Sequence, residues 1–170
     1  MPHTALRRGC LALIIGVMLT APWPAFAQVI TAGPRSCPGV ALTFDLCPVR
    51  KGPGYDQALV DYLIDHHIPA TFFMSGKWIA KHDPEVEHLL GIGFFEVGTH
   101  GEVHAHLPMH DAKEQREEIA APVRLLSEHY AHDTTLFRPP YGEYNDTTVD
   151  VVKQLGLRFI QWSKKLISLR

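Results

Sequence analysis

The sequence predicts an α/β protein built on a parallel sheet, and two observations support this class. Five short apolar segments alternate along the chain with segments that have the apolar spacing of amphipathic helices. The apolar segments are nearly continuous instead of alternating with polar residues, which is typical of strands in a parallel sheet covered by helices. An open sheet and a (β/α) barrel both satisfy this pattern.

Strands are expected where a short apolar run ends in a turn or helix signal. In chain order these runs are residues 39–44, 70–74, 94–98, 134–137 and 157–162. The first run ends before Pro48, the second follows Pro69, and the third follows Gly93. The fourth leads into a loop rich in proline and glycine, and the fifth begins after Gly156.

Helices are expected in the gaps between these strands. The segments with helical spacing are residues 55–66, 75–90, 111–130 and 145–155. The second is interrupted near Pro84, and Asp111 is a plausible N-cap for the third. Gly156 follows the last segment as a stop signal.

The first 27 residues have the pattern of a cleavable export signal. Arg7 and Arg8 precede the apolar run Cys10–Thr20, and the small residues of Ala25–Ala27 provide a cleavage site. This run is too short to span a bilayer, so no stable membrane anchor is expected. We expect residues 28–170 to form one periplasmic or secreted domain after cleavage near Ala27.

Charge and composition narrow the expected partners. The chain has 16 basic and 18 acidic residues, and loss of Arg7 and Arg8 with the signal makes the mature protein more acidic. Because no basic patch is present, nucleic acid is not an expected partner. The 11 histidines are unusual for 170 residues and suggest metal binding or acid–base chemistry. Nothing in the composition indicates an oligomeric state.

The mature chain contains two cysteines, Cys37 and Cys47, which an oxidising compartment would allow to pair. The expected strand at 39–44 lies between them, and an extended strand would hold the sulfurs too far apart. A disulfide therefore requires the flanking loops to fold back, and two unpaired thiols are the alternative.

Polar residues follow three of the expected strands. Asp45 follows the first strand, His100 and His104 the third, and Arg138 and Tyr141 the fourth. Because parallel strands bring their carboxyl ends to one edge, these residues are expected to form a site there.

Each of these residues also has a structural interpretation. Asp45 can be a base or a metal ligand, or it can cap a turn. Two imidazoles at i and i+4 can bind one metal ion if the loop curls, or they can belong to a solvated loop. Arg138 can pair with Asp45 and favour its ionised form, and the backbone N–H of Tyr141 can serve an oxyanion. Alternatively, their loop is only a rigid structural loop with Arg138 at its surface.

Three segments in this order resemble the motifs of the polysaccharide deacetylases with a NodB-homology domain, carbohydrate esterase family 4. The family motifs Thr-Phe-Asp-Asp, His-Ser/Thr-x-x-His and Arg-x-Pro-Tyr correspond to Thr43–Leu46, His100–His104 and Arg138–Tyr141. The resemblance covers roughly residues 40–162. It implies a distorted (β/α) barrel, and an enzyme that removes N-acetyl groups from chitin, peptidoglycan or related glycans.

The resemblance also implies roles for individual residues. Asp45 would be the general base that activates water, oriented by Arg138, while His100 and His104 would bind a divalent metal. Zn²⁺ is expected, although histidine ligands also suit Co²⁺ and Ni²⁺.

Two further roles concern the acetyl group of the substrate. The backbone N–H of Tyr141 would stabilise the tetrahedral oxyanion. Trp162, near the family's fourth motif, would form a wall of the acetyl pocket.

The sequence departs from the family pattern in two main ways. Leu46 stands where the family has a metal-binding Asp. Asp45 would then ligate the metal, Cys47 would replace the ligand as a thiolate, or the metal would bind weakly or not at all. The family's fifth motif, Leu-x-His, is absent, and residues 163–170 do not continue the strand–helix pattern. We therefore expect a barrel that is incomplete at the C-terminus.

These observations favour an exported, metal-dependent hydrolase that acts on an N-acetylated polysaccharide. A hydrolase of another C–N bond, such as that of a small cyclic amide, is an alternative. A truncated relative that binds glycan or metal without turnover is a third possibility.

Overall fold

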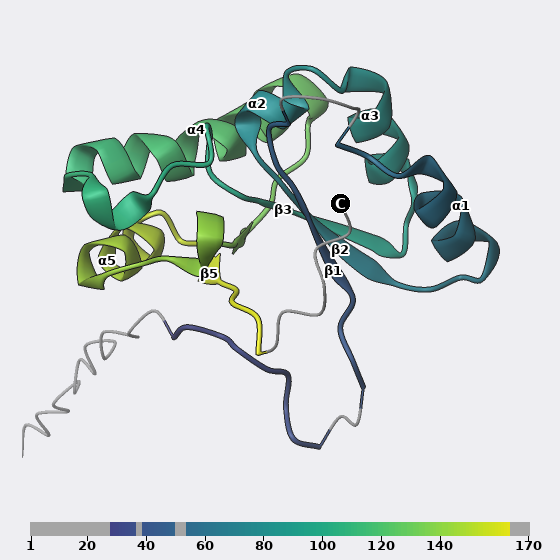
Figure 1. Ribbon diagram of the computed structural model, residues 1–170, viewed down its shortest axis with the longest axis horizontal. Helices are drawn as coiled ribbons and strands as arrows, with labels where there is room; N and C mark the ends of the chain where they lie inside the picture. Colours follow the sequence, from purple (N-terminus) through teal and green to yellow (C-terminus); the bar gives the residue numbers. More distant parts are fainter. Residues whose placement is uncertain (1–27, 37–38, 50–53, 164–170) are drawn as a thin grey trace, which may run out of the picture.

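The computed structural model describes residues 28–36, 39–49 and 54–163, which form a parallel sheet flanked by helices (Figure 1). The strands are β1 (Thr43–Leu46), β2 (Ala70–Met74), β3 (Phe95–Thr99), β4 (Leu136–Phe137) and β5 (Arg158–Phe159). The α-helices are α1 (Gln57–Asp65), α2 (Gly76–Ile79), α3 (Asp83–Gly91), α4 (Ala112–Tyr130) and α5 (Asp146–Gln154). Short 3-10 helices are η1 (Leu107–Met109) and η2 (Pro140–Gly142).

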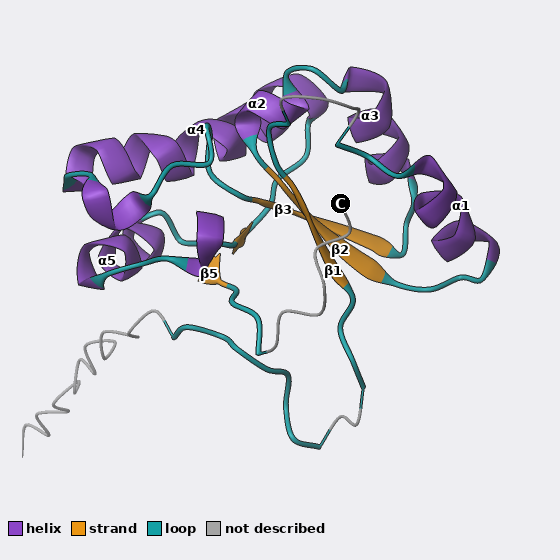
Figure 2. Cartoon of the chain, viewed as in Figure 1, coloured by secondary structure: helices purple, strands orange, loops and turns teal. Residues whose placement is uncertain are grey.

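The strands lie in chain order, β1-β2-β3-β4-β5, and each pair of neighbours is parallel. The α-helices form an arc along one side of the sheet, as in the outer layer of a (β/α) barrel (Figure 2). Beyond β5, Ile30 bridges Ile160 in parallel. The Ile30 N–H donates to the Phe159 carbonyl at 2.9 Å, and the Ile30 carbonyl accepts from the Gln161 N–H at 2.8 Å.

The register of the strands decides which side chains face the helices. Leu46 pairs with Met74, Met74 with Thr99, Thr99 with Phe137 and Phe137 with Phe159. The side chains of this row of residues point towards the helices, where the apolar ones are buried. Because side chains alternate along a strand, the residues immediately before and after this row face the opposite side. We call that opposite side the site face.

Two apolar clusters join the sheet to its helices. The larger one packs β1, β2 and β3 against helices α1 to α4, with Phe72, Met74 and Trp78 at most 2% exposed. The smaller one packs β4 and β5 against α4 and α5, with Phe137 and Phe159 at its centre. These clusters fix the strands from one side and leave the site face for polar residues.

The helices begin at capping residues that the sequence makes recognisable. The Asp111 carboxylate accepts backbone hydrogen bonds from Lys113 and Glu114, and Glu114 closes a capping box. The prediction of Asp111 as an N-cap is therefore confirmed. Asn145 forms a second capping box at the start of α5. These caps set where the loop before each helix ends.

The predicted elements are confirmed with shifted ends. The first strand is displaced from 39–44 to 43–46, since its register with β2 begins at Thr43. The helical stretch predicted from Ser75 is divided into α2 and α3, with Pro84 in the first turn of α3. The fourth strand is shorter than predicted, because only Leu136 and Phe137 pair with neighbours.

The predicted export signal, residues 1–27, lies outside the described residues, as does all but Ser163 of the predicted break in pattern at 163–170. Within the described residues, no helix has both the length and the apolar character needed to cross a membrane.

Candidate active site

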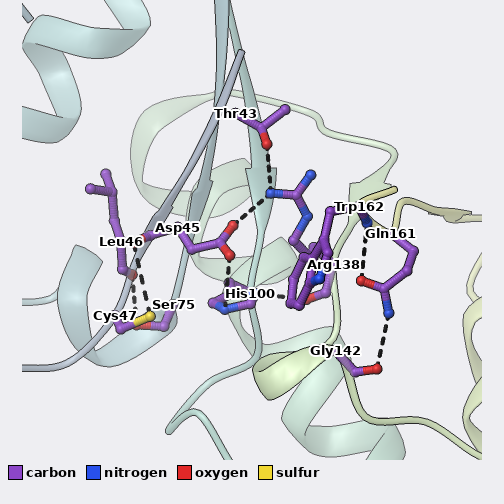
Figure 3. Close-up of polar contacts among 10 residues, drawn as sticks. All are labelled: Thr43, Asp45, Leu46, Cys47, Ser75, His100, Arg138, Gly142, Gln161 and Trp162. Atoms are coloured by element: carbon purple, nitrogen blue, oxygen red, sulfur yellow. Dashed lines mark hydrogen bonds and ion pairs between the residues drawn. The ribbon is translucent and has the colours of Figure 1, made fainter. Parts of the chain in front are cut away.

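The site lies where the strands end on the site face of the sheet (Figure 3). Asp45 is on β1, His100 follows β3, Arg138 follows β4, and Trp162 comes after β5. Figure 3 shows the Asp45 carboxylate between the Arg138 guanidinium and the His100 ring. The strand ends thus bring together residues that are far apart in sequence, as predicted.

Asp45 is paired with a buried arginine. Arg138 Nη1 donates to Asp45 Oδ1 at 2.8 Å and to Thr43 Oγ1 at 2.9 Å. The guanidinium carbon lies 4.0 Å from the centre of the Phe73 ring and 5.5 Å from that of Trp162. The Arg138 side chain is 3% exposed and that of Asp45 is 28% exposed. Arg138 is therefore held rigidly, while the carboxylate remains open to solvent and substrate.

A glycine makes room for the aromatic platform under Arg138. Phe73 is the register partner of Gly98 on the site face. A Cβ at Gly98 would lie 2.8 Å from the Phe73 ring and 2.9 Å from the Leu136 Cβ. Any larger residue at 98 would therefore push Phe73 away from the guanidinium that it supports.

His100 is oriented by a backbone carbonyl. Its Nδ1 lies 2.9 Å from the Arg138 carbonyl oxygen, which only accepts hydrogen bonds. Nδ1 therefore carries the proton, and Nε2 presents its lone pair 3.9 Å from Asp45 Oδ2. Burial lowers the pKa of His100, although the nearby Asp45 opposes this shift. The ring is thus neutral at pH 7 and ready to bind a cation.

His104 lies beside His100, with ring centres 5.0 Å apart. Its backbone has a φ of 64°, so the loop curls as the predicted metal site requires. Burial and the neighbouring His100 lower its pKa from 6.5 to about 4. Both imidazoles are consequently neutral near pH 7, which is the form that binds metals.

Glu118 on α4 fixes the loop that carries the two histidines. Its Oε1 accepts the backbone N–H groups of Val103 and Ala105, each at 3.0 Å. Gly101, with a φ of 75°, lies against this carboxylate, and a Cβ there would be 2.9 Å from Glu118 Oε1. Sequence analysis missed Glu118, although the glycine at 101 is the signal that space is needed there.

The sequence also places Tyr141 in the site, and the structure brings it to the histidines. Its ring stacks on His106 at 4.0 Å and meets the edge of His104 at 4.3 Å. Its backbone φ of 58° is unusual for a residue with a side chain. Such strain is frequent at functional sites. The predicted role of its backbone N–H towards an oxyanion stays a prediction.

Trp162 reaches the site through a specific loop contact. Gln161 Nε2 donates to the Gly142 carbonyl at 2.9 Å, and the Gln161 amide oxygen accepts the Trp162 N–H at 3.1 Å. Gly142 has a φ of 73° and lies so close that a Cβ would be 2.7 Å from the indole. Trp162 thus stands beside Arg138, and its predicted role as a pocket wall stays a prediction.

A set of three side chains has the donors to bind a metal. Nitrogen atoms of His100 and His104 and the sulfur of Cys47 lie within 4.8 Å of one another. This spacing approaches what bonds of about 2.0–2.3 Å to one ion need. Leu46, at the position of the family's metal-binding Asp, is 8% exposed and belongs to the apolar core. Whether Cys37 and Cys47 pair, which the sequence left open, concerns a residue, Cys37, that lies outside the described part.

A sequence model of the family described as "Polysaccharide deacetylase" matches residues 32–160. The chain belongs to the polysaccharide deacetylase family. Its relatives include a bifunctional xylanase/xylan deacetylase of Cellvibrio japonicus, 32% identical over 75% of this chain and 19% of that protein. Another is a peptidoglycan-N-acetylglucosamine deacetylase of Bacillus cereus, 28% identical over 78% of this chain and 46% of that protein.

The fold of the family is confirmed by a solved structure. A CE4 family pseudoenzyme from Bacillus anthracis superposes with a TM-score of 0.72 at 23% identity, over 81% of this chain and 47% of that chain. The chain spans less than half of the length of each of these three proteins. Its parallel strands and outer helices correspond to part of the family's (β/α) barrel.

Proposed function

We propose that this polysaccharide deacetylase relative is an exported, metal-dependent hydrolase that removes N-acetyl groups from a chitin- or peptidoglycan-like polysaccharide. The observation that carries the proposal is the position of Asp45. One carboxylate oxygen is held by Arg138 at 2.8 Å, and the other lies 3.9 Å from the His100 Nε2. A carboxylate fixed in this way, beside two neutral imidazoles, suits proton abstraction from water at an amide carbonyl.

Each residue has a separate task in this reaction. Asp45 takes the proton from the attacking water, and Arg138 keeps Asp45 in the orientation for that transfer. Tyr141 donates its backbone N–H to the oxygen that becomes negatively charged at the acetyl carbon. Trp162 encloses the methyl end of the acetyl group, next to Arg138. Together these tasks describe acyl transfer from nitrogen to water: the water oxygen bonds to the acetyl carbon, the C–N bond breaks, and the amine leaves with the proton that Asp45 took from the water.

His100 and His104 would hold the metal ion. Their donor set fits, because both rings are neutral at pH 7 and the His100 proton is fixed on the nitrogen that points away from Asp45. A bound divalent ion polarises the acetyl carbonyl and makes water more acidic. Histidine ligands favour Zn²⁺, with Co²⁺ and Ni²⁺ as alternatives.

Export is part of the proposal, because a polysaccharide of the cell wall is reached from outside the cytoplasm. The support is the signal-like sequence that ends near Ala27. Mass spectrometry of the protein from a periplasmic or culture fraction tests it. A mature chain that begins at Gln28 is expected, and an intact Met1 in the cytoplasmic fraction would contradict export.

Acetate release tests the catalytic proposal. We expect the Zn²⁺-supplemented protein to release acetate from acetylated chitooligosaccharides or peptidoglycan fragments. Asp45→Asn should lower the rate by at least about 10²-fold, since it removes the base. Asp150→Asn, which changes an exposed carboxylate on α5, should leave the rate unchanged.

Other outcomes of the same assay identify the alternatives. Ring opening of small cyclic amides, with no acetate from any glycan, would replace the proposal by a hydrolase of another C–N bond. Calorimetric binding of acetylated glycan without turnover would instead indicate a non-catalytic relative.

A further inference from the structure

A third side chain, that of Cys47, lies beside the two histidines that would hold the metal ion. We infer that Cys47 supplies the third protein ligand, as a thiolate, to the ion held by His100 and His104. This inference rests on the metal centre of the proposed function. It gives the centre two nitrogen donors and one sulfur donor, in place of a carboxylate ligand.

The pleat of β1 explains why Leu46 cannot be that ligand. Asp45 faces the site, so the next residue along an extended strand must face the opposite side. Leu46 accordingly packs in the larger apolar cluster, paired in register with the buried Met74. Figure 3 shows its side chain directed away from Asp45 and His100.

The same pleat returns Cys47 to the site face. It lies two residues after Asp45, and the residues that follow β3 and β4 on this face are His100 and Arg138. The Cys47 sulfur lies 3.9 Å from the backbone carbonyl oxygen of Asp45. It also lies within 4.8 Å of the donor nitrogens of both histidines. Three donors from two separate strand ends therefore converge on one point.

Asp45 has one carboxylate oxygen engaged by Arg138 and the other 3.9 Å from His100 Nε2, but it does not belong to the set of three converging donors. Its Oδ1 is engaged by Arg138 Nη1, which in turn is held by Thr43 and by the Phe73 ring. Among the described residues, Cys47, His100 and His104 form the group of three whose donors lie close enough together. A thiolate at 47 therefore leaves Asp45 free as the base.

A sulfur ligand changes which metals the site prefers. Thiolates are soft donors that favour Zn²⁺ and Co²⁺, whereas carboxylate and water ligands suit Mg²⁺, Ca²⁺ and Mn²⁺. We expect Zn²⁺ and Co²⁺ to bind tightly and Mg²⁺ to compete poorly. A Co²⁺–thiolate bond also has charge-transfer absorption in the near ultraviolet, which a site made of histidine and carboxylate lacks.

Cobalt titration of the metal-free, full-length chain tests the inference, with a phosphine reductant present throughout. We expect the charge-transfer band in the wild type and in Cys37→Ser, which changes the other cysteine of the mature chain. In Cys47→Ser the band should vanish and Co²⁺ and Zn²⁺ affinity should fall at least about 10-fold. Cys47→Asp restores an anionic ligand, so it should bind Co²⁺ without the band.

The outcomes separate this inference from the proposed function. The thiolate ligand alone is overturned if the wild-type chain binds Co²⁺ and releases acetate without showing the band. It is also overturned if Cys47→Ser keeps both the affinity and the band of the wild type. Wild-type chain that binds neither ion overturns both. If Cys47→Ser does not fold, the band in the wild type and its absence in Cys47→Asp still decide the question.

Discussion

Arg138 and Asp45, 93 residues apart in sequence, meet through a single guanidinium nitrogen, Nη1, which also donates to Thr43. The contact joins the ends of β1 and β4, between which β2 and β3 lie. The geometry of this contact depends on the register of the strands between Asp45 and Arg138. The contact orients the Asp45 carboxylate, which is the base of the proposed reaction. The site is therefore sensitive to changes at Arg138 that leave the charge of Asp45 untouched.

Replacing Arg138 tests this dependence. Arg138→Gln removes the cation and leaves the carboxylate without its partner, so we expect acetate release to fall by about 10²-fold or more. The free energy of unfolding should fall by roughly 3 kcal/mol, at the lower end for a broken buried pair, since Asp45 is partly exposed. Arg158→Gln, which changes an exposed arginine on β5, should alter neither quantity by much. Full activity in Arg138→Gln would contradict the positioning role.

Glu118 is expected to control metal binding without touching the metal. Glu118→Ala removes the acceptor of two backbone N–H groups in the histidine loop, so metal affinity should fall about 10- to 100-fold. Glu118→Gln keeps an acceptor oxygen and should stay close to the wild type. Calorimetric titration with Zn²⁺ measures the affinity, and hydrogen exchange at Val103 and Ala105 measures loop order.

The neighbouring Glu117 provides the matched control. Its exposed side chain pairs with Arg124 on the surface of α4. Glu117→Ala should therefore leave Zn²⁺ affinity unchanged. Equal losses in Glu117→Ala and Glu118→Ala would show that the charge of the helix, and not the loop contact, sets the affinity.

The lowered pKa of His104 predicts a pH dependence of the metal-free protein. The unfolded chain takes up a proton near pH 6.5, whereas folded His104 does so only near pH 4. The unfolded state thus binds more protons in this window, so stability falls as the pH falls from 6.5 to 4. Asp45, His100 and His106 are the charged or titratable groups that influence His104.

Chemical denaturation between pH 7 and 4 measures this effect. His104→Gln should lose less stability on acidification than the wild type, because glutamine takes up no proton. His129→Gln, a change on the exposed end of α4, should follow the wild-type curve. Identical slopes for the wild type and His104→Gln would refute the assignment.

Gly142 is expected to hold Trp162 in place. In Gly142→Ala the new methyl group combines left-handed backbone strain with a contact on the indole. We expect the free energy of unfolding to fall by roughly 2–3 kcal/mol and KM for acetylated glycan to rise. Gly156→Ala shares the positive φ, at 71°, but has no atom within 4 Å of the added carbon.

Comparison of the two alanine variants separates strain from steric displacement. Gly156→Ala should cost roughly 1 kcal/mol and leave KM unchanged, because it bears the strain alone. If the two variants lose the same free energy of unfolding and have the same KM, the contact between residue 142 and Trp162 does not affect substrate binding.

Much of the site could be predicted because strand ends are visible in sequence. The apolar runs before Asp45, His100 and Arg138 stop abruptly, and parallel strands must then bring these residues to one edge. The departure at Leu46 was equally visible. The sequence did not show which residue replaces the missing ligand, because that depends on which side chains of β1 face the site. This alternation depends on where β1 ends, and β1 extends two residues further than predicted.

Glu118 shows what the sequence does not reveal. It lies 15 residues from Val103 within a helix that carries several acidic residues on its surface. Nothing local distinguishes it from Glu117, since the difference arises from which side of α4 faces the histidine loop. The fourth strand was predicted at 134–137, but its short length was not, because that length is set by its pairing partners and not by its own residues.

The bridge between Ile30 and Ile160 imposes an order on the assembly of the pocket. During synthesis Ile30 emerges early, but its partner emerges only when nearly all the described chain has been made. Pairing of such distant segments is slow, so closure of the β5 edge is a late kinetic event. Trp162 lies two residues beyond this bridge, so its place beside Arg138 depends on a segment that the bridge holds. A chain interrupted before residue 160 would thus hold its reactive pair in an open, unwalled site.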